Sequence, residues 1–163
     1  MSEMNIIKVG MADLNIGRDP DVLTTLGLGS CVGIALYDAT VKIGGLAHIM
    51  LPDSTQIKNN DNVAKFADTA IEVLMDRLIE IGARKNRLVA KIAGGAHMFE
   101  FKNMDDMMRI GTRNVNAVIQ ILENNSIPII GRDTGNNYGR TVELYTSTGI
   151  FRIKTIGHGI KEI

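Results

Sequence analysis

The chain has 163 residues, 45% of them hydrophobic and 22% charged, which is ordinary for one globular domain over residues 1–163. Its 18 basic and 18 acidic residues cancel, so nucleic acids and anionic membranes, which attract a clustered basic excess, are disfavoured as partners. A single cysteine excludes an internal disulfide and falls short of a zinc ligand set.

Short runs of strand-forming residues fill the first third of the chain. The amino-terminal residues lack the basic start and apolar stretch of a signal peptide, and no apolar run approaches the roughly 18 residues of a membrane span. We therefore expect a location in the reducing cytoplasm, where a lone thiol persists, and no membrane insertion. The strands predicted here are 6–9, 22–26, 31–37 and 41–51.

The middle of the chain predicts helices. Apolar residues recur at helical spacing over 64–81, Gly82 is a plausible stop, and a second helix is expected to include 113–123. The stretch 53–62 is polar and predicts an exposed loop. Further strands are predicted at 88–93, 127–131, 141–145 and 150–155, the last two flanking a hairpin turn. Hairpins with two isolated helices favour an α+β fold, either a β-sandwich or a large mixed sheet with helices packed outside it.

The only cysteine, Cys31, begins a run that forms a predicted hairpin with the segment containing His48. If Ala39 and Thr40 form the centre of a symmetric turn, Tyr37 faces Lys42 and Cys31 faces His48. Directly opposed residues of an antiparallel pair have Cβ atoms about 4.5–5.5 Å apart on the same face. The pairing therefore selects His48 as the base that a cysteine nucleophile needs.

The residues before the cysteine form a glycine-rich bend. Gly27 and Gly29 allow positive φ, and backbone amides near Ser30 and Cys31 are candidates to bind a developing oxyanion. The hydroxyl of Thr25, across the bend, is a candidate to orient the imidazole. The competing interpretation is structural, because a lone intracellular cysteine is more often a buried hydrophobe.

These segments resemble the CheD family of chemoreceptor glutamine deamidases. The matching motifs are "TLGLGSCV" (25–32), "AHIMLP" (47–52), "KIAGGAHMF" (91–99), "IGTRN" (110–114) and "DTGNNYGRTVE" (133–143), which occur in the family's order over most of the chain.

The resemblance implies a cysteine hydrolase that converts chemoreceptor glutamines to glutamates through a thioester, without metal or organic cofactor. Cys31 would be the nucleophile, His48 the general base and acid, and Thr25 the orienting residue, with Gly29 and Ser30 at the oxyanion or substrate. The implied fold is an α/β sandwich related to toxins that deamidate glutamine. The implied partners are receptor cytoplasmic helices and the CheY-phosphate phosphatase CheC.

Two positions depart from the family's pattern. Asn136 stands where a second turn glycine is expected, and Asn tolerates left-handed backbone better than most residues. His97 lies in a motif that has no fixed histidine, which gives it an accessory role. His158 has no motif that recommends it.

Two alternatives to the enzyme remain open. One is a docking module for CheC or receptor helices without turnover, in which case Cys31 lacks the lowered pKa and low-pH alkylation of an activated thiol. The other is a phosphate or nucleotide site at Gly94-Gly95 or at 133–140, neither of which has a P-loop or dinucleotide spacing. Met104, Met107 and Met108 could grip an apolar partner or pack in the core, and Asp105-Asp106 without further ligands predict a solvated pair rather than a metal site.

Overall fold

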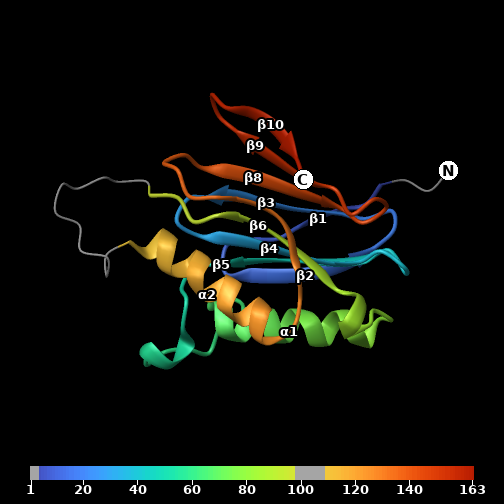
Figure 1. Cartoon of the computed structure of the whole chain (residues 1–163), viewed down its shortest axis with the longest axis horizontal. Coiled ribbons are helices and arrows are strands. Elements are labelled where there is room, and N and C mark those ends of the chain that lie inside the picture. Colours follow the sequence, from blue (N-terminus) through green and yellow to red (C-terminus); the bar gives the residue numbers. More distant parts are fainter. Residues whose placement is uncertain (1–3, 98–108) are drawn as a thin grey trace.

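The structure, a computed structural model, describes residues 4–97 and 109–163. Within these residues, two five-stranded mixed sheets lie face to face, and two α-helices cover one of them (Figure 1). We call the helix-covered sheet the central sheet and the other the outer sheet. The predicted α+β sandwich with helices packed outside it is confirmed.

The central sheet has the strand order β2-β5-β4-β6-β7, and its β6 and β7 are parallel. The outer sheet has the order β1-β3-β8-β9-β10, and its β1 and β3 are parallel. The strands of the central sheet are β2 (Asp13–Arg18), β4 (Val32–Asp38), β5 (Ile43–Ile49), β6 (Val89–Gly94) and β7 (Ile129–Thr134). Those of the outer sheet are β1 (Ile6–Lys8), β3 (Val22–Leu28), β8 (Arg140–Tyr145), β9 (Phe151–Thr155) and β10 (Gly159–Glu162).

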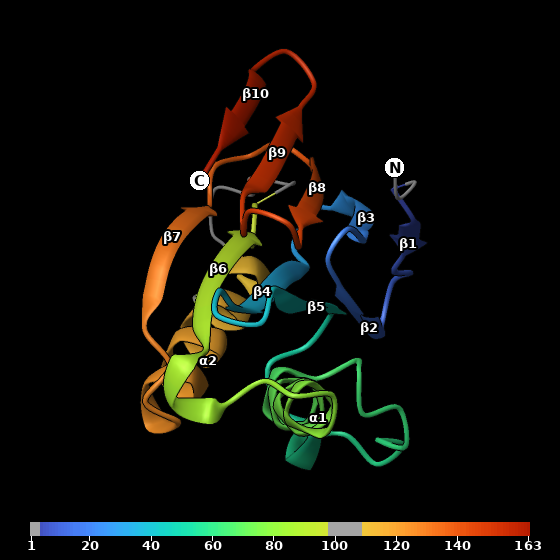
Figure 2. The same cartoon turned by 90° about the vertical axis from the view of Figure 1, so that its right-hand side faces the viewer.

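Helices α1 (Ala67–Glu80) and α2 (Ile110–Asn124) pack side by side against the central sheet, as Figure 2 shows from the end. Short 3₁₀ turns η1 (Ser54–Gln56) and η2 (Lys85–Arg87) precede and follow α1. The buried stripe of α1 contains Ala67, Ala70, Ile71, Leu74, Met75 and Leu78. This stripe is the one that the helical spacing predicts.

Two apolar layers result, one on each face of the central sheet. The helix-side layer holds Ile34, Ala47 and Ile49 with the stripes of both helices. The inter-sheet layer holds Cys31, Ala35 and Leu46 with residues of β3, β8 and β9. Strand residues two apart share a face, so alternate positions of β4 and β5 belong to different layers.

One helix start and two strands are the main differences from the sequence prediction. The helix predicted from residue 64 begins at Ala67, because the carbonyl of Lys65 accepts the amides of Met50 and Leu51 and Phe66 pairs with Leu51. Strands β2 and β10 were not predicted. β2 is mostly polar and lies at the edge of the central sheet, and β10 is exposed at every position, so neither carries a strong apolar signal.

Candidate active site

Cys31 lies immediately before β4, at the end of the sandwich where the glycine-rich bend enters the central sheet. Its side chain is 7% exposed and belongs to the inter-sheet layer. The nucleophile candidate is therefore at the rim of the core, covered but close to solvent.

His48 lies near the end of β5, and its side chain is fully buried. The predicted register of the hairpin is wrong: His48 faces Gly33 rather than Cys31, and Tyr37 faces Gly44 rather than Lys42. The turn has four residues, 39–42, between Asp38 and Ile43, so its centre lies one residue later than predicted.

Two local features produce this longer turn. The carboxylate of Asp38 accepts the amide N–H of Thr40 at 3.0 Å, and Lys42 adopts a left-handed φ of 53°. The resulting displacement of the pairing is two residues. A displacement of two keeps every side chain on its predicted face, whereas a displacement of one reverses all of them. Cys31 thus becomes a diagonal neighbour of His48 on the inter-sheet face, with Gly33 opposite the imidazole.

Thr25 meets His48 across the two sheets. The Thr25 Oγ1 and the His48 Nδ1 are 2.7 Å apart, and both residues are buried. Thr25 lies on β3 just before a bulge that interrupts the pairing with β8, in which Gly27 has a left-handed φ of 71°. The predicted contact of this hydroxyl with the imidazole is confirmed.

The other ring nitrogen of His48 lacks a hydrogen-bond partner among residues 4–97 and 109–163. Nε2 is buried and makes no hydrogen bond within the part of the chain that the structure describes. An unpaired nitrogen on a fully buried imidazole is unfavourable unless something binds it. His48 is therefore oriented at one nitrogen and open at the other, which is the arrangement a general base requires.

Backbone hydrogen bonds fix the main chain around the cysteine. The amide of Gly95 donates to the carbonyl of Cys31 at 2.8 Å, and the amide of Ala96 donates to the carbonyl of Gly29 at 2.9 Å. Gly94 has a φ of 112°, and a Cβ on it would lie 2.2 Å from the Cys31 carbonyl oxygen. Gly94-Gly95 therefore pack against Cys31, and a Cβ on Gly95 would meet Val115 of α2 at 2.2 Å, which favours their structural interpretation over a phosphate site.

The amides of the glycine-rich bend divide into two kinds. The amide of Gly29 donates to the carbonyl of Gly27 at 3.1 Å and is already used. The amides of Ser30 and Cys31 donate to no oxygen among the residues described. Of the predicted oxyanion donors, the Ser30 and Cys31 amides remain candidates, and the Gly29 amide does not.

Burial sets the charge of the pair. Burial raises the pKa of the Cys31 thiol, and a hydrogen bond from its own amide opposes this only in part. Burial lowers the pKa of His48 below 6.5. Both groups are consequently neutral at pH 7. The resting site therefore lacks the lowered thiol pKa of an activated cysteine, and on this one criterion it matches the docking alternative.

The remaining histidines stand apart from this pair. The His97 amide donates to the carbonyl of Asn136 at 2.8 Å, and its Nε2 lies 2.9 Å from the Thr112 hydroxyl. Asn136 has a φ of 59°, so the left-handed turn expected at this departure from the family is present. His158 stacks on Tyr138 with ring centroids 4.2 Å apart.

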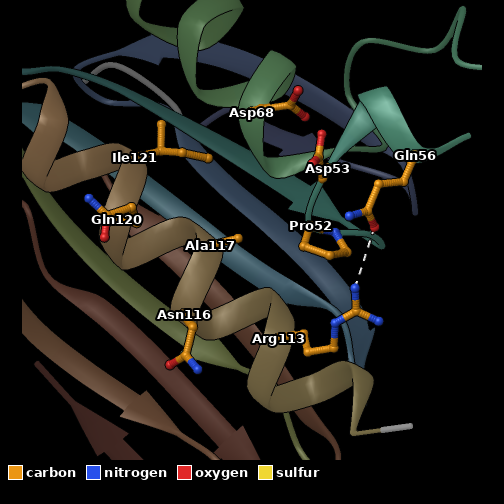
Figure 3. A pocket seen from close by; sticks show the side chains of 9 residues that line it. All are labelled: Pro52, Asp53, Gln56, Asp68, Arg113, Asn116, Ala117, Gln120 and Ile121. Carbon is orange, nitrogen blue, oxygen red and sulfur yellow. Dashed lines mark hydrogen bonds between the residues drawn. The ribbon is translucent and has the colours of Figure 1, made fainter. Parts of the chain in front are cut away.

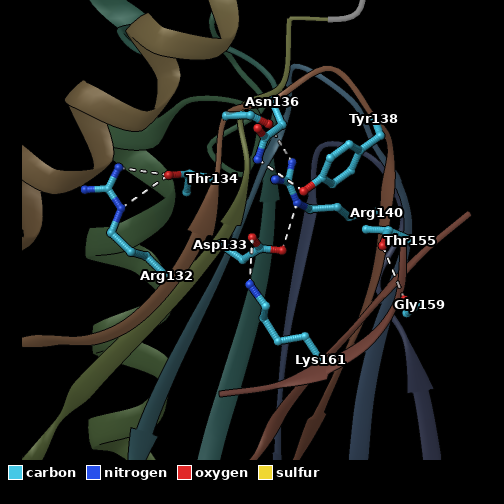
Figure 4. Close-up of polar contacts among 10 residues, drawn as sticks. Arg132, Asp133, Thr134, Asn136, Tyr138, Arg140, Thr155, Gly159 and Lys161 are labelled. Atoms are coloured by element: carbon cyan, nitrogen blue, oxygen red, sulfur yellow. Dashed lines mark hydrogen bonds and ion pairs between the residues drawn. The ribbon is translucent and has the colours of Figure 1, made fainter. Parts of the chain in front are cut away.

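The motif at 133–143 forms a polar cluster, shown in Figure 4. Asp133 accepts from Arg140 at 3.2 Å and lies 3.6 Å from the ammonium of Lys161. Arg140 also donates to the carbonyl of Gly135 at 3.0 Å, and the amide of Gly135 donates to the carbonyl of Gly94. The cluster holds the loop that supports Gly94-Gly95, and the cluster's contacts give this motif a structural role.

A groove lies between α2 and the loop at η1, away from the candidate catalytic residues (Figure 3). This groove has a volume of about 480 Å³. Arg113 reaches across it to Gln56 at 3.4 Å, and the walls include Pro52, Ala117 and Ile121. None of the three candidate catalytic side chains lines it.

Two further observations concern metal ions and membranes. No group of three or more His, Cys, Asp or Glu in residues 4–97 and 109–163 is arranged to hold a metal ion. No helix in these same residues is long and apolar enough to cross a membrane. The Met-rich segment and Asp105-Asp106 lie outside the described residues.

A buried polar residue beside the candidate site is not singled out by the sequence prediction. Asn114 is completely buried on α2, and its side-chain amide donates to the carbonyls of both Ser30 and Met50 at 3.0 Å. It occupies the same helical stripe as Val118 and Leu122. A polar residue on an otherwise apolar stripe is the signal that marks it.

Comparison with known proteins gives a consistent result. The family model described as CheD chemotactic sensory transduction matches residues 50–155. A protein of Lachnoclostridium phytofermentans, named probable chemoreceptor glutamine deamidase CheD, is 56% identical over 163 residues, the whole of both chains. Proteins of the same name from Caldanaerobacter subterraneus and Clostridium botulinum are 53% identical over 161 residues and 56% identical over 157 residues. The match with the Caldanaerobacter protein covers 99% of both chains. The match with the Clostridium protein covers 96% of this chain and 97% of the relative.

Proposed function

The chain belongs to the CheD family, and from this premise we propose that it hydrolyses glutamine side chains of bacterial chemoreceptors to glutamates in chemotaxis. The observation that carries the proposal is the 2.7 Å contact between Thr25 and His48, on the same face as Cys31, with Nε2 of the imidazole unpaired within the described residues. Nucleophile, base and orienting group are the parts that acyl transfer through a cysteine needs.

The first half of the reaction forms a thioester. In the required tautomer, Nδ1–H of His48 donates to the Thr25 hydroxyl oxygen, and Nε2 accepts the thiol proton while Cys31 Sγ attacks the side-chain carbonyl carbon. The amides of Ser30 and Cys31 donate to the oxyanion that forms. The imidazolium then returns its proton to the amide nitrogen, the C–N bond breaks, and ammonia leaves.

The second half consumes water. Nε2 of His48 takes a proton from a water molecule, whose oxygen attacks the thioester carbonyl. The C–S bond breaks, the thiol recovers its proton, and the product is glutamate. Because burial keeps both groups neutral at rest, the thiol must pass its proton to His48 during the first half of the reaction.

The product changes the receptor's charge. Each turnover replaces a neutral amide with a carboxylate, which adds repulsion where acidic side chains are neighbours. The family resemblance also implies a CheC-type phosphatase as a partner of this chain. Co-purification of the two proteins, with and without Cys31→Ala, tests that partnership independently of turnover.

The test of the activity uses receptor cytoplasmic fragments. The unmodified chain should release ammonia and convert particular glutamines to glutamates, which mass spectrometry maps, and Cys31→Ala should do neither. Tight binding of the fragments without ammonia release would instead support the docking module and overturn the enzyme.

A further inference from the structure

Asn114 links the two segments that carry the candidate nucleophile and base. Its Nδ2 donates to the carbonyl of Ser30, the residue before Cys31, and to the carbonyl of Met50, two residues after His48. Both distances are 3.0 Å, and the side chain is completely buried.

The position of these carbonyls explains why a side chain is needed there. The β4–β5 ladder has its last pair at Val32 and Ile49, so Ser30 and Met50 lie just beyond it. Both residues are partly buried, and a carbonyl beyond the end of a ladder needs a donor from elsewhere. The amide of Asn114 supplies one N–H to each, and it holds the two strand ends together where the ladder no longer does.

The oxygen of the Asn114 amide differs from its nitrogen. Oδ1 of Asn114 is buried and has no hydrogen-bond partner in the described part of the chain. A buried unpaired acceptor is destabilising. The two hydrogen bonds donated by Nδ2 must therefore offset the cost of the unpaired oxygen.

We propose that Asn114 is a positioning residue for the deamidation, one that fixes the separation of Cys31 and His48 through their flanking carbonyls. The inference rests on the proposed function. Asn114 acts through the backbone, so its loss lowers kcat and leaves KM within about twofold. A misplacement near 1 Å lowers turnover by about 100-fold, and we expect a loss of about 10- to 100-fold.

Asn114→Asp separates this role from simple packing. The two side chains have nearly the same shape, but an ionised aspartate has no donor and faces two carbonyl oxygens. Burial and these oxygens raise the pKa of the introduced carboxyl. Its protonated form regains one O–H donor, so the ratio of kcat for Asn114→Asp to kcat for the unmodified chain should rise as pH falls.

The experiment measures ammonia release from receptor fragments across pH for four proteins: the unmodified chain, Asn114→Asp, Asn114→Ala and Asn116→Asp. Asn114→Ala has no donor at any pH, so its ratio should stay low and flat. Asn116 is exposed on the same helix and lines the groove of Figure 3, so Asn116→Asp should match the unmodified chain.

Several outcomes overturn the inference. These are a kcat for Asn114→Asp within about twofold of the unmodified chain, a loss confined to KM, or a flat ratio for both Asn114 variants. Failure of both variants to fold, judged by thermal unfolding, would assign Asn114 to stability alone and also overturns it. An unmodified chain that releases no ammonia overturns the proposed function first, and the inference with it.

Discussion

The β4–β5 hairpin buries polar side chains at both of its ends, but it satisfies them differently. At the turn end, the carboxylate of Asp38 is fully buried and accepts from Thr40, Arg84 and Arg87 at 2.9–3.1 Å. At the open end, His48 is equally buried and has the Thr25 hydroxyl as its one side-chain partner among the described residues.

The two ends also differ in charge. Burial by itself raises the pKa of Asp38, but hydrogen bonds from Arg84, Arg87 and Thr40 outweigh it, so this pKa lies below its ordinary value. No such compensation acts on His48 or fully on Cys31, and burial keeps both neutral. At the turn end, a full set of hydrogen-bond donors keeps Asp38 charged. At the open end, Cys31 and His48 stay neutral, as the proposed proton transfer between them requires.

Removing the nucleophile should have the largest effect on the open end. Cys31→Ala eliminates thioester formation, so ammonia release from receptor fragments should fall at least about 1,000-fold. The thermal midpoint should change little, because a small buried side chain at the rim is replaced by a smaller one. Persistent turnover would place the nucleophile elsewhere.

Removing the base should have the next largest effect. His48→Gln keeps a polar group but cannot accept the thiol proton, and general-base catalysis contributes about 100- to 10,000-fold. Single-turnover kinetics should show slower release of ammonia and slower hydrolysis of the thioester. Unchanged turnover would contradict the assignment of His48.

Removing the orienting hydroxyl should have a smaller effect. Thr25→Val preserves the shape of the side chain and deletes the contact with Nδ1, so kcat should fall by about 10- to 100-fold through misorientation of the imidazole. Thr24→Val, one residue earlier on β3, is the matched control. Thr24 bonds the carbonyl of Val142 rather than the imidazole, so its loss should not lower kcat.

The pH dependence tests whether the open end is neutral. Because burial lowers the pKa of His48 below 6.5, kcat/KM should stay constant down through pH 6.5 and fall only at lower pH, where the base becomes protonated. Because burial raises the pKa of Cys31 above 9.0, alkylation by iodoacetamide should increase about tenfold per pH unit up to that region. Fast alkylation that does not depend on pH near neutrality would indicate a preformed thiolate–imidazolium pair instead.

Changing the turn end should have the smallest effect on activity. Asp38→Asn removes the charge that Arg87 and the backbone amides of Thr40 and Arg84 hold, and it should destabilise the protein by about 1–3 kcal/mol with kcat unchanged. The pKa of Asp38 is depressed, so its contribution is present above the ordinary value of 3.8 and is lost as pH falls through the folded value. Thermal unfolding at pH 7 and at pH 3 should therefore show a smaller difference between the two proteins in acid. A large loss of kcat would show that the two ends are coupled.

From the sequence, the faces on which Cys31 and His48 lie are predicted correctly, but the register of the β4–β5 hairpin is not. The faces of Cys31 and His48 were predicted correctly from an incorrect pairing, because strand side chains repeat every two residues and the displacement was two. The turn that caused the displacement depends on the Asp38 side chain and on the left-handed Lys42, which hairpin counting does not include.

Other features of the site require the folded chain. Asn114 bonds carbonyls 84 and 64 residues away, and main-chain carbonyls carry no residue-type signal in a sequence. The direction of the Cys31 pKa depends on burial between two sheets, which neither the hairpin pairing nor the nearby glycines reveal in the sequence.

The covered and neutral state of Cys31 has a consequence for the lifetime of the protein. Peroxides oxidise thiolates that solvent can reach, first to sulfenic acid and then irreversibly to sulfinic and sulfonic acids. At rest Cys31 is 7% exposed and its thiol keeps its proton, so both conditions for that damage are poorly met. The same burial that would make the sulfur depend on His48 in the proposed reaction protects it from oxidants between turnovers.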